Sequence, residues 1–466
     1  MSEIRVVSQH AGTVLAGQLA VMAFGVADTV IVGRYSDVAL AALSVGSAIY
    51  ISVFVGLIGI VQALLPIWSE MMGARRHEAI GRSLRQSLYM CSLITLAGMA
   101  ALLFSSPLLR WAQVPELMRE EVQHYLSILA FAFAPSLLFR LYSTFNQSLG
   151  KPLLVTWLQL AALALKIPLS MWLVAGGGGV DAMGAAGCAW ATLVVNYLLL
   201  ALAFIMLRTQ SLYEPFGIWR SMERPDWSQI GGFARLGIPG GLAYLVEVTS
   251  FTLMALFIAR MGTVATASHQ IAASVSAVLY MMPLSIAIAC SARVSFWLGA
   301  GKPVYAKRAV VLGLKLTAIT AISLYAIILI ARGFLASLYS SSPEIVELAS
   351  SLLVWVAVYH IADAMQALSA FLLRCYRITL APLALYCVLL WGVGLYGGYT
   401  LAYSGFARIP PTQSASSFWA ASTIAIALVA ACLLGVLWHA VRSSLRTMPF
   451  VKISRGRSGA PVPPGR

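Results

Sequence analysis

Three carboxylates stand within apolar stretches of the chain, namely Asp28, Glu247 and Asp363. A charged group at the centre of a bilayer costs about 2.5–3.5 kcal/mol on insertion scales, so it usually faces a cavity or a partner. Glu247 and Asp363 are central in their stretches and have no cation within one helical turn, which favours a functional role over an internal ion pair. Asp28 lies nearer the end of its stretch, where a charge that reaches the membrane interface is a stronger alternative.

These acids could carry or bind a cation. Burial favours the neutral form of a carboxyl group, which suits a proton carrier, and two carboxylates with a hydroxyl can hold Na⁺ through oxygen ligands. Tyr359 precedes Asp363 by one turn on the same helix face, where it supplies an oxygen or packs as an ordinary aromatic residue. Negative charge also attracts organic cations. We therefore predict ion-coupling or substrate-binding sites at Asp28, Glu247, Tyr359 and Asp363, with the last three holding Na⁺ if it is the coupling ion.

Basic residues also occur within the apolar stretches. Lys166 is central in its stretch, at a depth comparable to that of Asp28, so we hypothesise an ion pair between them. Arg140 either modulates the charge of the site in a similar way or reaches the cytoplasmic interface. Arg293 and Lys315 lie within two turns of the predicted cytoplasmic ends of their spans, and we expect both to extend to the interface.

The elements that carry these residues are predicted from composition. Of 466 residues, 60% are hydrophobic and only 10% are charged, and the mean hydropathy is +0.86. A soluble domain has about 25% charged residues, and a spanning helix needs about 20 apolar residues. We therefore predict an all-α polytopic membrane protein with twelve transmembrane helices. The predicted spans are 12–33, 39–67, 86–107, 122–149, 153–175, 184–207, 233–259, 269–297, 309–331, 346–373, 380–403 and 418–441.

The distribution of basic residues predicts the orientation. With the N-terminus in the cytoplasm, 21 of the 31 Lys and Arg residues fall on the inside, six outside and four within spans. This follows the positive-inside rule and predicts that both termini are cytoplasmic. The net charge of +15 therefore reflects topology and contact with membrane lipid, and we expect no nucleic-acid partner.

The two halves of the sequence are similar at a constant offset of 226 positions. Gly73-Ala74-Arg75-Arg76 corresponds to Gly299-Ala300-Gly301-Lys302, and Phe145 corresponds to Phe371. Six spans in each half give a parallel repeat about an axis along the membrane normal, which predicts two six-helix bundles with the site between them. The predicted divisions are a cytoplasmic tail at 1–11, bundles at 12–207 and 233–441, a basic linker at 208–232 and a basic tail at 442–466 that we expect to be disordered.

Several segments resemble the multidrug and toxic compound extrusion (MATE) family, in particular its NorM-like bacterial branch. They are 27–34 (ADTVIVGR), 236–240 (LGIPG) leading to Glu247, 268–272 (SHQIA), 282–287 (MPLSIA) and 363–366 (DAMQ). The resemblance implies two six-helix bundles, export of organic cations in exchange for Na⁺ or H⁺, a bacterial inner-membrane location and no enzymatic activity or cofactor. We expect a monomer.

The resemblance also implies roles for single residues. Glu247 and Asp363 would bind the coupling cation with Tyr359 nearby, and Asp28 would serve proton coupling or substrate release. The sequence departs from the family at Lys166 and Ser170, where Asn is usual, and at two polar positions of the fourth span. The N-terminal half is thus where this chain's chemistry is expected to differ.

Three other classes of membrane protein are alternatives. A related flippase for a lipid-linked or anionic precursor is favoured by Lys166 and Arg140, but Glu247 and Asp363 oppose it. A membrane enzyme would need catalytic groups clustered in loops, and the loops here are short. A channel would need rings of like residues, usually from several subunits.

Overall fold

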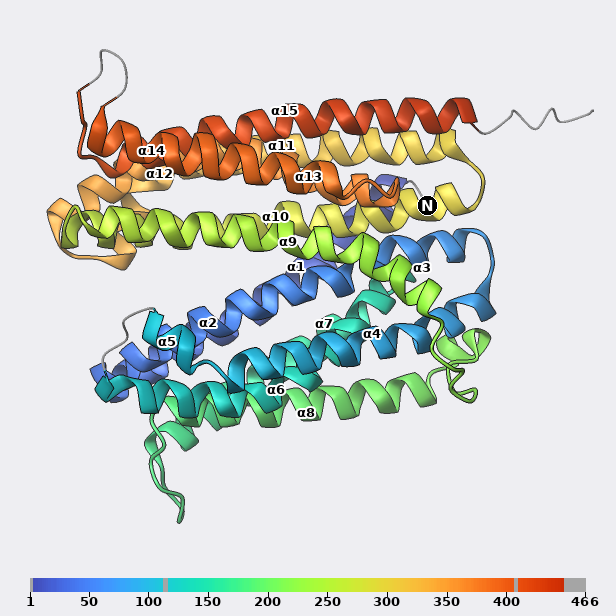
Figure 1. The fold of residues 1–466 in the computed structure, drawn as a ribbon, viewed down its shortest axis with the longest axis horizontal. Coiled ribbons are helices and arrows are strands. Elements are labelled where there is room, and N and C mark those ends of the chain that lie inside the picture. The colour runs from blue at the N-terminus through green and yellow to red at the C-terminus, as the bar shows by residue number, and fades with distance from the viewer. Residues whose placement is uncertain (1–2, 112–115, 406–409, 448–466) are drawn as a thin grey trace, which may run out of the picture.

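The computed structural model describes residues 3–111, 116–405 and 410–447, and in this part twelve helices are long and apolar enough to cross a membrane (Figure 1). The predicted all-α architecture with twelve spans is therefore confirmed. The elements are α1 (Glu3–Tyr35), α2 (Asp37–Gln62), α3 (Leu64–Gly73), α4 (His77–Leu103), α5 (Ser106–Trp111), α6 (Glu116–Ser148), α7 (Leu153–Ala175), α8 (Ala185–Thr209), η1 (Ser211–Phe216), α9 (Trp227–Ala259), α10 (Thr263–Gly299), α11 (Pro303–Tyr339), α12 (Pro343–Cys375), α13 (Leu380–Leu385), η2 (Tyr386–Tyr396), α14 (Gly397–Tyr399), η3 (Thr400–Ser404) and α15 (Ala415–Thr447).

The helix ends follow local sequence signals. The Asp226 side chain accepts a hydrogen bond from the Gln229 N–H at 3.2 Å and caps α9, while prolines occupy the first positions of α11 and α12. Such caps satisfy backbone donors that have no partner within the helix. Most helices extend beyond the predicted spans, among them the first and the last. The first begins at Glu3, inside the expected tail, and the last ends at Thr447; residues 448–466 lie outside the described part of the chain.

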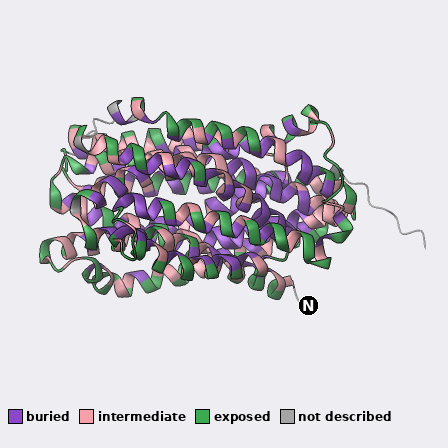
Figure 2. Cartoon of the chain, turned by 90° about the horizontal axis from the view of Figure 1, so that it is seen from below, coloured by how far each residue is buried: buried purple, intermediate pink, exposed green. Residues whose placement is uncertain are grey.

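Two buried apolar clusters divide the helices between two layers (Figure 1). One cluster spans 32–233, and the other is built mainly from 243–441. The second also contains the first turns of α1, including Val7 and Ala11, which explains why the chain is helical there: these residues bury an apolar face against α10. Figure 2 shows buried residues in the interior and exposed ones around it.

The two layers contact each other closely through glycines. A Cβ atom on Gly59 of α2 would lie 2.6 Å from the Cα atom of Gly241 on α9. A Cβ atom on Gly73 would overlap the carbonyl oxygen of Phe296, and one on Gly299 would overlap the carbonyl oxygen of Glu70. Small residues allow backbones to approach in this way in membrane proteins. Gly73 and Gly299 are also equivalent positions in the sequence repeat.

Two ion pairs join the layers at the predicted cytoplasmic end. Arg293 donates from Nε to Glu3 Oε2 at 2.7 Å and from Nη2 to Glu3 Oε1 at 2.5 Å, and Arg377 Nη2 lies 2.5 Å from Glu70 Oε2. The ion pair of Arg293 was not predicted, because the carboxylate comes from the start of α1, which the sequence assigned to a tail. These contacts hold the two layers together at that end.

The linker between the halves is packed against α4. Glu223 accepts hydrogen bonds from Arg85 Nε at 2.8 Å and Arg85 Nη2 at 2.5 Å, and Arg85 Nη1 donates to the Gly217 carbonyl at 2.7 Å. The hydrogen bonds from Arg85 lower the pKa of Glu223 to about 2. Phe216 packs edge-on against Phe145, with ring centroids 5.6 Å apart.

Candidate functional site

Glu247 and Tyr359 line one small cavity in the C-terminal layer. Helices α9, α12 and α15 and the π-helical segment η2 form its walls, which also include Ser250, Phe251 and Ser422. Glu247 is half-buried and Tyr359 is 3% exposed. The cavity therefore combines one carboxylate, three hydroxyl groups and aromatic surface.

Asp363 lies beside this cavity, one turn along α12 from Tyr359. It is 3% exposed and within electrostatic range of Glu247. Its Oδ1 atom accepts a hydrogen bond from Gln366 Nε2 at 3.0 Å, and the Tyr386 hydroxyl donates to Gln366 Oε1. The structure thus brings together the three residues predicted for the C-terminal half. Among the described residues, no basic side chain forms an ion pair with either acid.

Glu247 follows a stretch of α9 in which the backbone hydrogen bonding is interrupted. Pro239 lies inside the helix and has no N–H, so the carbonyl of Arg235 one turn earlier lacks its usual donor. Gly241 lies directly against α2, where a Cβ atom would overlap the carbonyl oxygen of Gly56. Trp391 of η2 donates from Nε1 to the Val246 carbonyl at 3.3 Å and fixes the turn that carries Glu247.

Asp28 and Lys166 form a separate site in the N-terminal layer. Lys166 Nζ lies 2.9 Å from Asp28 Oδ1, and the two side chains are 1% and 11% exposed. The ion pair hypothesised from sequence is therefore present. Lys166 also donates to Thr192 Oγ1 at 2.8 Å, and the Ser170 hydroxyl donates to Asp28 Oδ1 at 3.4 Å. The two unusual residues of α7, Lys166 and Ser170, thus both contact Asp28.

Arg140 lies apart from both acid sites. Its side chain is half-buried on α6, its Nε atom has no hydrogen-bond partner, and it is within electrostatic range of Tyr244 on α9. It therefore adds positive charge between the layers and does not pair with Asp28.

Comparison with known proteins decides the family. The sequence profile of the MatE family matches residues 14–172 and 239–400, which together make up more than half of the chain. The chain belongs to the MATE family of transporters. The resemblance inferred from the sequence motifs is confirmed, and the chain is a transporter rather than an enzyme.

Relatives match over nearly the whole length. The chain is 36% identical over 433 residues to the probable multidrug resistance protein NorM of Aromatoleum aromaticum, covering 93% of each chain. It is 31% identical to the multidrug resistance protein PmpM of Pseudomonas aeruginosa, covering 88% of this chain and 86% of that protein. The MATE assignment therefore applies to both halves.

Solved MATE structures share the fold. The eukaryotic transporter AtDTX14 superposes with a TM-score of 0.84 at 21% identity, covering 95% of this chain and 98% of that one. The bent form of the Vibrio cholerae transporter VcmN superposes with a TM-score of 0.77 at 17% identity, covering 95% and 97%. At these identities the likeness shows the fold alone.

Some contacts around the acids were not predicted. Gln366 could have been found, because it lies three residues after Asp363 and so on the same face of the helix. Tyr386 and Thr192 approach from other helices, and no spacing in the sequence indicates that they reach the sites.

Proposed function

We propose that this MATE chain is a secondary antiporter that exports organic cations, including drugs, in exchange for Na⁺ or H⁺. The central observation is that Glu247 faces a cavity with aromatic walls and no described basic partner. A carboxylate in such a place attracts a cation from either solution. The multidrug resistance names of the relatives support a drug substrate.

The coupling follows from competition for charge. An organic cation and a coupling ion each compensate the charge of Glu247 and Asp363, so binding of one favours release of the other. The hydroxyl oxygens of Tyr359, Ser250 and Ser422 are hard ligands suited to Na⁺, while a proton needs only the carboxyl groups. Gln366 holds Asp363 in place by its hydrogen bond.

Export also requires that the two layers move against each other. The contacts among Glu3, Arg293, Glu70 and Arg377 close the predicted cytoplasmic end, which corresponds to a state that releases substrate outside. Opening these contacts would admit substrate from the cytoplasm. We place the protein in the bacterial inner membrane with both termini inside, acting as a monomer.

A flippase for an anionic or lipid-linked substrate is the second candidate. Buried nitrogen atoms of Arg140 and Arg374 have no hydrogen-bond partner, and such atoms suit an anion. Lys166 does not support this reading, because Asp28 already compensates its charge.

The test is transport by the purified protein in sealed vesicles loaded with a fluorescent organic cation. Efflux should accelerate when either an inward Na⁺ gradient or an inward proton gradient is imposed, and the matching ionophore should abolish the effect. Efflux that ignores both gradients, together with translocation of a fluorescent anionic lipid, would favour the flippase instead.

A further inference from the structure

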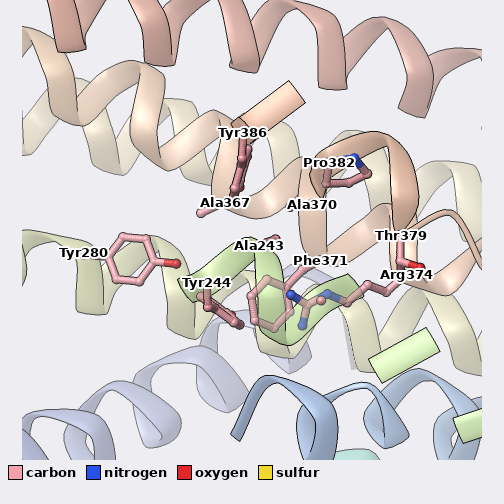
Figure 3. Close-up of a pocket in the computed structure, with 11 residues that line it drawn as sticks. Ala243, Tyr244, Tyr280, Ala367, Ala370, Phe371, Arg374, Thr379, Pro382 and Tyr386 are labelled. Atoms are coloured by element: carbon pink, nitrogen blue, oxygen red, sulfur yellow. The ribbon is translucent and has the colours of Figure 1, made fainter. Parts of the chain in front are cut away.

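A second cavity lies deeper in the C-terminal layer, toward the predicted cytoplasmic end. It is bounded by α9, α10, α12, α13 and the start of η2, is partly open to the exterior, and is small, with a volume of about 20 Å³. Figure 3 shows the side chains that line it. Its walls contain one cation, Arg374, and three tyrosines, Tyr244, Tyr280 and Tyr386. None of the described residues that line it is acidic.

Arg374 is held in this cavity without a counter-charge. It is 5% exposed, and its guanidinium carbon lies 4.6 Å from the ring centroid of Phe371 and 5.2 Å from that of Tyr244. Its Nη1 atom has no hydrogen-bond partner, and no described carboxylate forms an ion pair with it. Aromatic faces compensate a buried cation only in part, and an unsatisfied charged donor is costly.

The other polar side chains of the cavity are the hydroxyls of Thr379 and the tyrosines, each of which can donate a hydrogen bond to an anion. The Tyr244 hydroxyl is buried beside the Arg374 guanidinium, and the Tyr280 hydroxyl points from α10 toward the middle of the cavity (Figure 3). Together with Arg374 Nη1, these groups border one space in which the described lining supplies a positive charge and no negative one. A small anion supplies the missing charge and accepts from Nη1 and the hydroxyls.

One residue that lines this cavity also belongs to the hydrogen-bond chain that ends at Asp363. Tyr386 lines the cavity and donates to Gln366, which in turn donates to Asp363. An occupant beside Tyr386 is therefore two side chains away from the carboxylate proposed to bind the coupling ion.

We propose that the Arg374 cavity binds one small anionic group, which is either a monovalent inorganic anion or the carboxylate of a zwitterionic substrate. Arginine presents a planar array of donors that matches a carboxylate and also binds a halide. The cationic part of such a substrate would then lie toward Glu247, and this part of the proposal rests on the proposed transport function.

Binding is tested by thermal unfolding of the full chain in detergent, with sodium salts at constant ionic strength. Chloride or formate should raise the unfolding midpoint in a saturable way compared with MES, a bulky sulfonate. Arg374→Gln should remove this rise, and Arg374→Lys should retain a weaker one. Arg442→Gln is the control, because Arg442 also lies over an aromatic ring but is exposed.

A gentler variant keeps the test valid if Arg374→Gln does not fold. Tyr280→Phe leaves the guanidinium in place and removes one donor, so it should weaken anion binding about fivefold. Absence of a saturable anion effect in the wild type, or an effect unchanged in both Arg374→Gln and Tyr280→Phe, would overturn the proposal.

Transport distinguishes the two sources of the anion. If the substrate supplies it, Arg374→Gln should raise the KM for rhodamine B, a zwitterion, about tenfold and leave the KM for its ethyl ester unchanged. If an inorganic anion supplies it, both dyes should respond alike, and replacing chloride with MES should slow the wild type but not the variant. The unfolding measurement does not require transport, so failure of the proposed function would not be mistaken for failure of the anion site.

Discussion

The ion pair between Lys166 and Asp28 is the clearest residue-scale feature of the N-terminal half. Lys166→Met would leave Asp28 without its cation, and removal of one member of a buried pair typically costs about 3–5 kcal/mol. We expect a lower unfolding temperature and an altered pH dependence of transport. The double variant Asp28→Asn/Lys166→Met should recover part of the stability, since no unpaired charge remains. If the pH dependence of transport were the same in Lys166→Met as in the wild type, the ion pair would have no role in coupling transport to protons.

For single residues, the sequence predicted which charged side chains matter better than it predicted their contacts. Asp28, Glu247 and Asp363 could be found because a carboxylate in an apolar stretch is unusual. In the sequence Arg374 is one of the 21 basic residues that fall on the predicted inside, yet in the structure it is 5% exposed and lines a cavity. Burial of a residue near a helix end depends on how neighbouring helices pack, and the sequence pattern does not carry that information.

The linker that connects the two halves gives a prediction at the scale of an element. Its Glu223 has its pKa lowered from 4.5 to about 2 by Arg85, so its ionised form favours the packed loop. This contribution is complete above about pH 4.5 and is lost as the pH falls toward 2. The rate of backbone hydrogen exchange in 211–226, corrected for the intrinsic rate at each pH, should therefore rise as the pH falls from about 4.5 toward 2.

Substitution separates this effect from general acid unfolding. Glu223→Gln should show the faster exchange already at neutral pH, whereas Glu214→Gln, at an exposed position in the same linker, should behave like the wild type. Equal exchange in both variants would show that the pairing with Arg85 does not hold the loop.

Among the elements, spans were predicted more reliably than their internal geometry. Apolar length alone predicts a span over 380–403, and a span is present there. Its π-helical segments η2 and η3 were not predicted, because a π-turn changes the hydrogen-bond register without a distinct residue signature. The geometry matters for the site, since Tyr386 and Trp391 both project from η2 toward residues around the acids.

For the whole molecule, the contact of Gly299 with the backbone of Glu70 predicts how the cytoplasmic end closes. Gly299→Val would place a side chain where the α3 backbone lies, at a cost of about 1–3 kcal/mol to this closed state. We expect the end to open more often, so that buried Cys375 reacts faster with a maleimide. Peptide mass spectrometry of the labelled protein measures this rate.

Gly435→Val is the matched control, because a Cβ atom at Gly435 meets nothing within 4 Å. If Cys375 reacted no faster in Gly299→Val than in this control, the glycine contact would not determine closure. The repeat in the sequence predicted that Gly73 and Gly299 are equivalent, but it could not predict which end of the molecule is closed. One sequence must be compatible with both states of an alternating-access cycle.

The central claim is that Glu247 and Asp363 couple export to the entry of Na⁺ or H⁺. It is tested most directly by gradient-driven efflux of a fluorescent cation from vesicles containing Glu247→Gln or Asp363→Asn. Glu344→Gln is the control, an exposed acid on the same helix as Asp363. We predict that efflux driven by the active gradient falls at least about tenfold in each of the first two variants and is unchanged in the control. Full gradient-driven efflux in both Glu247→Gln and Asp363→Asn would contradict the account.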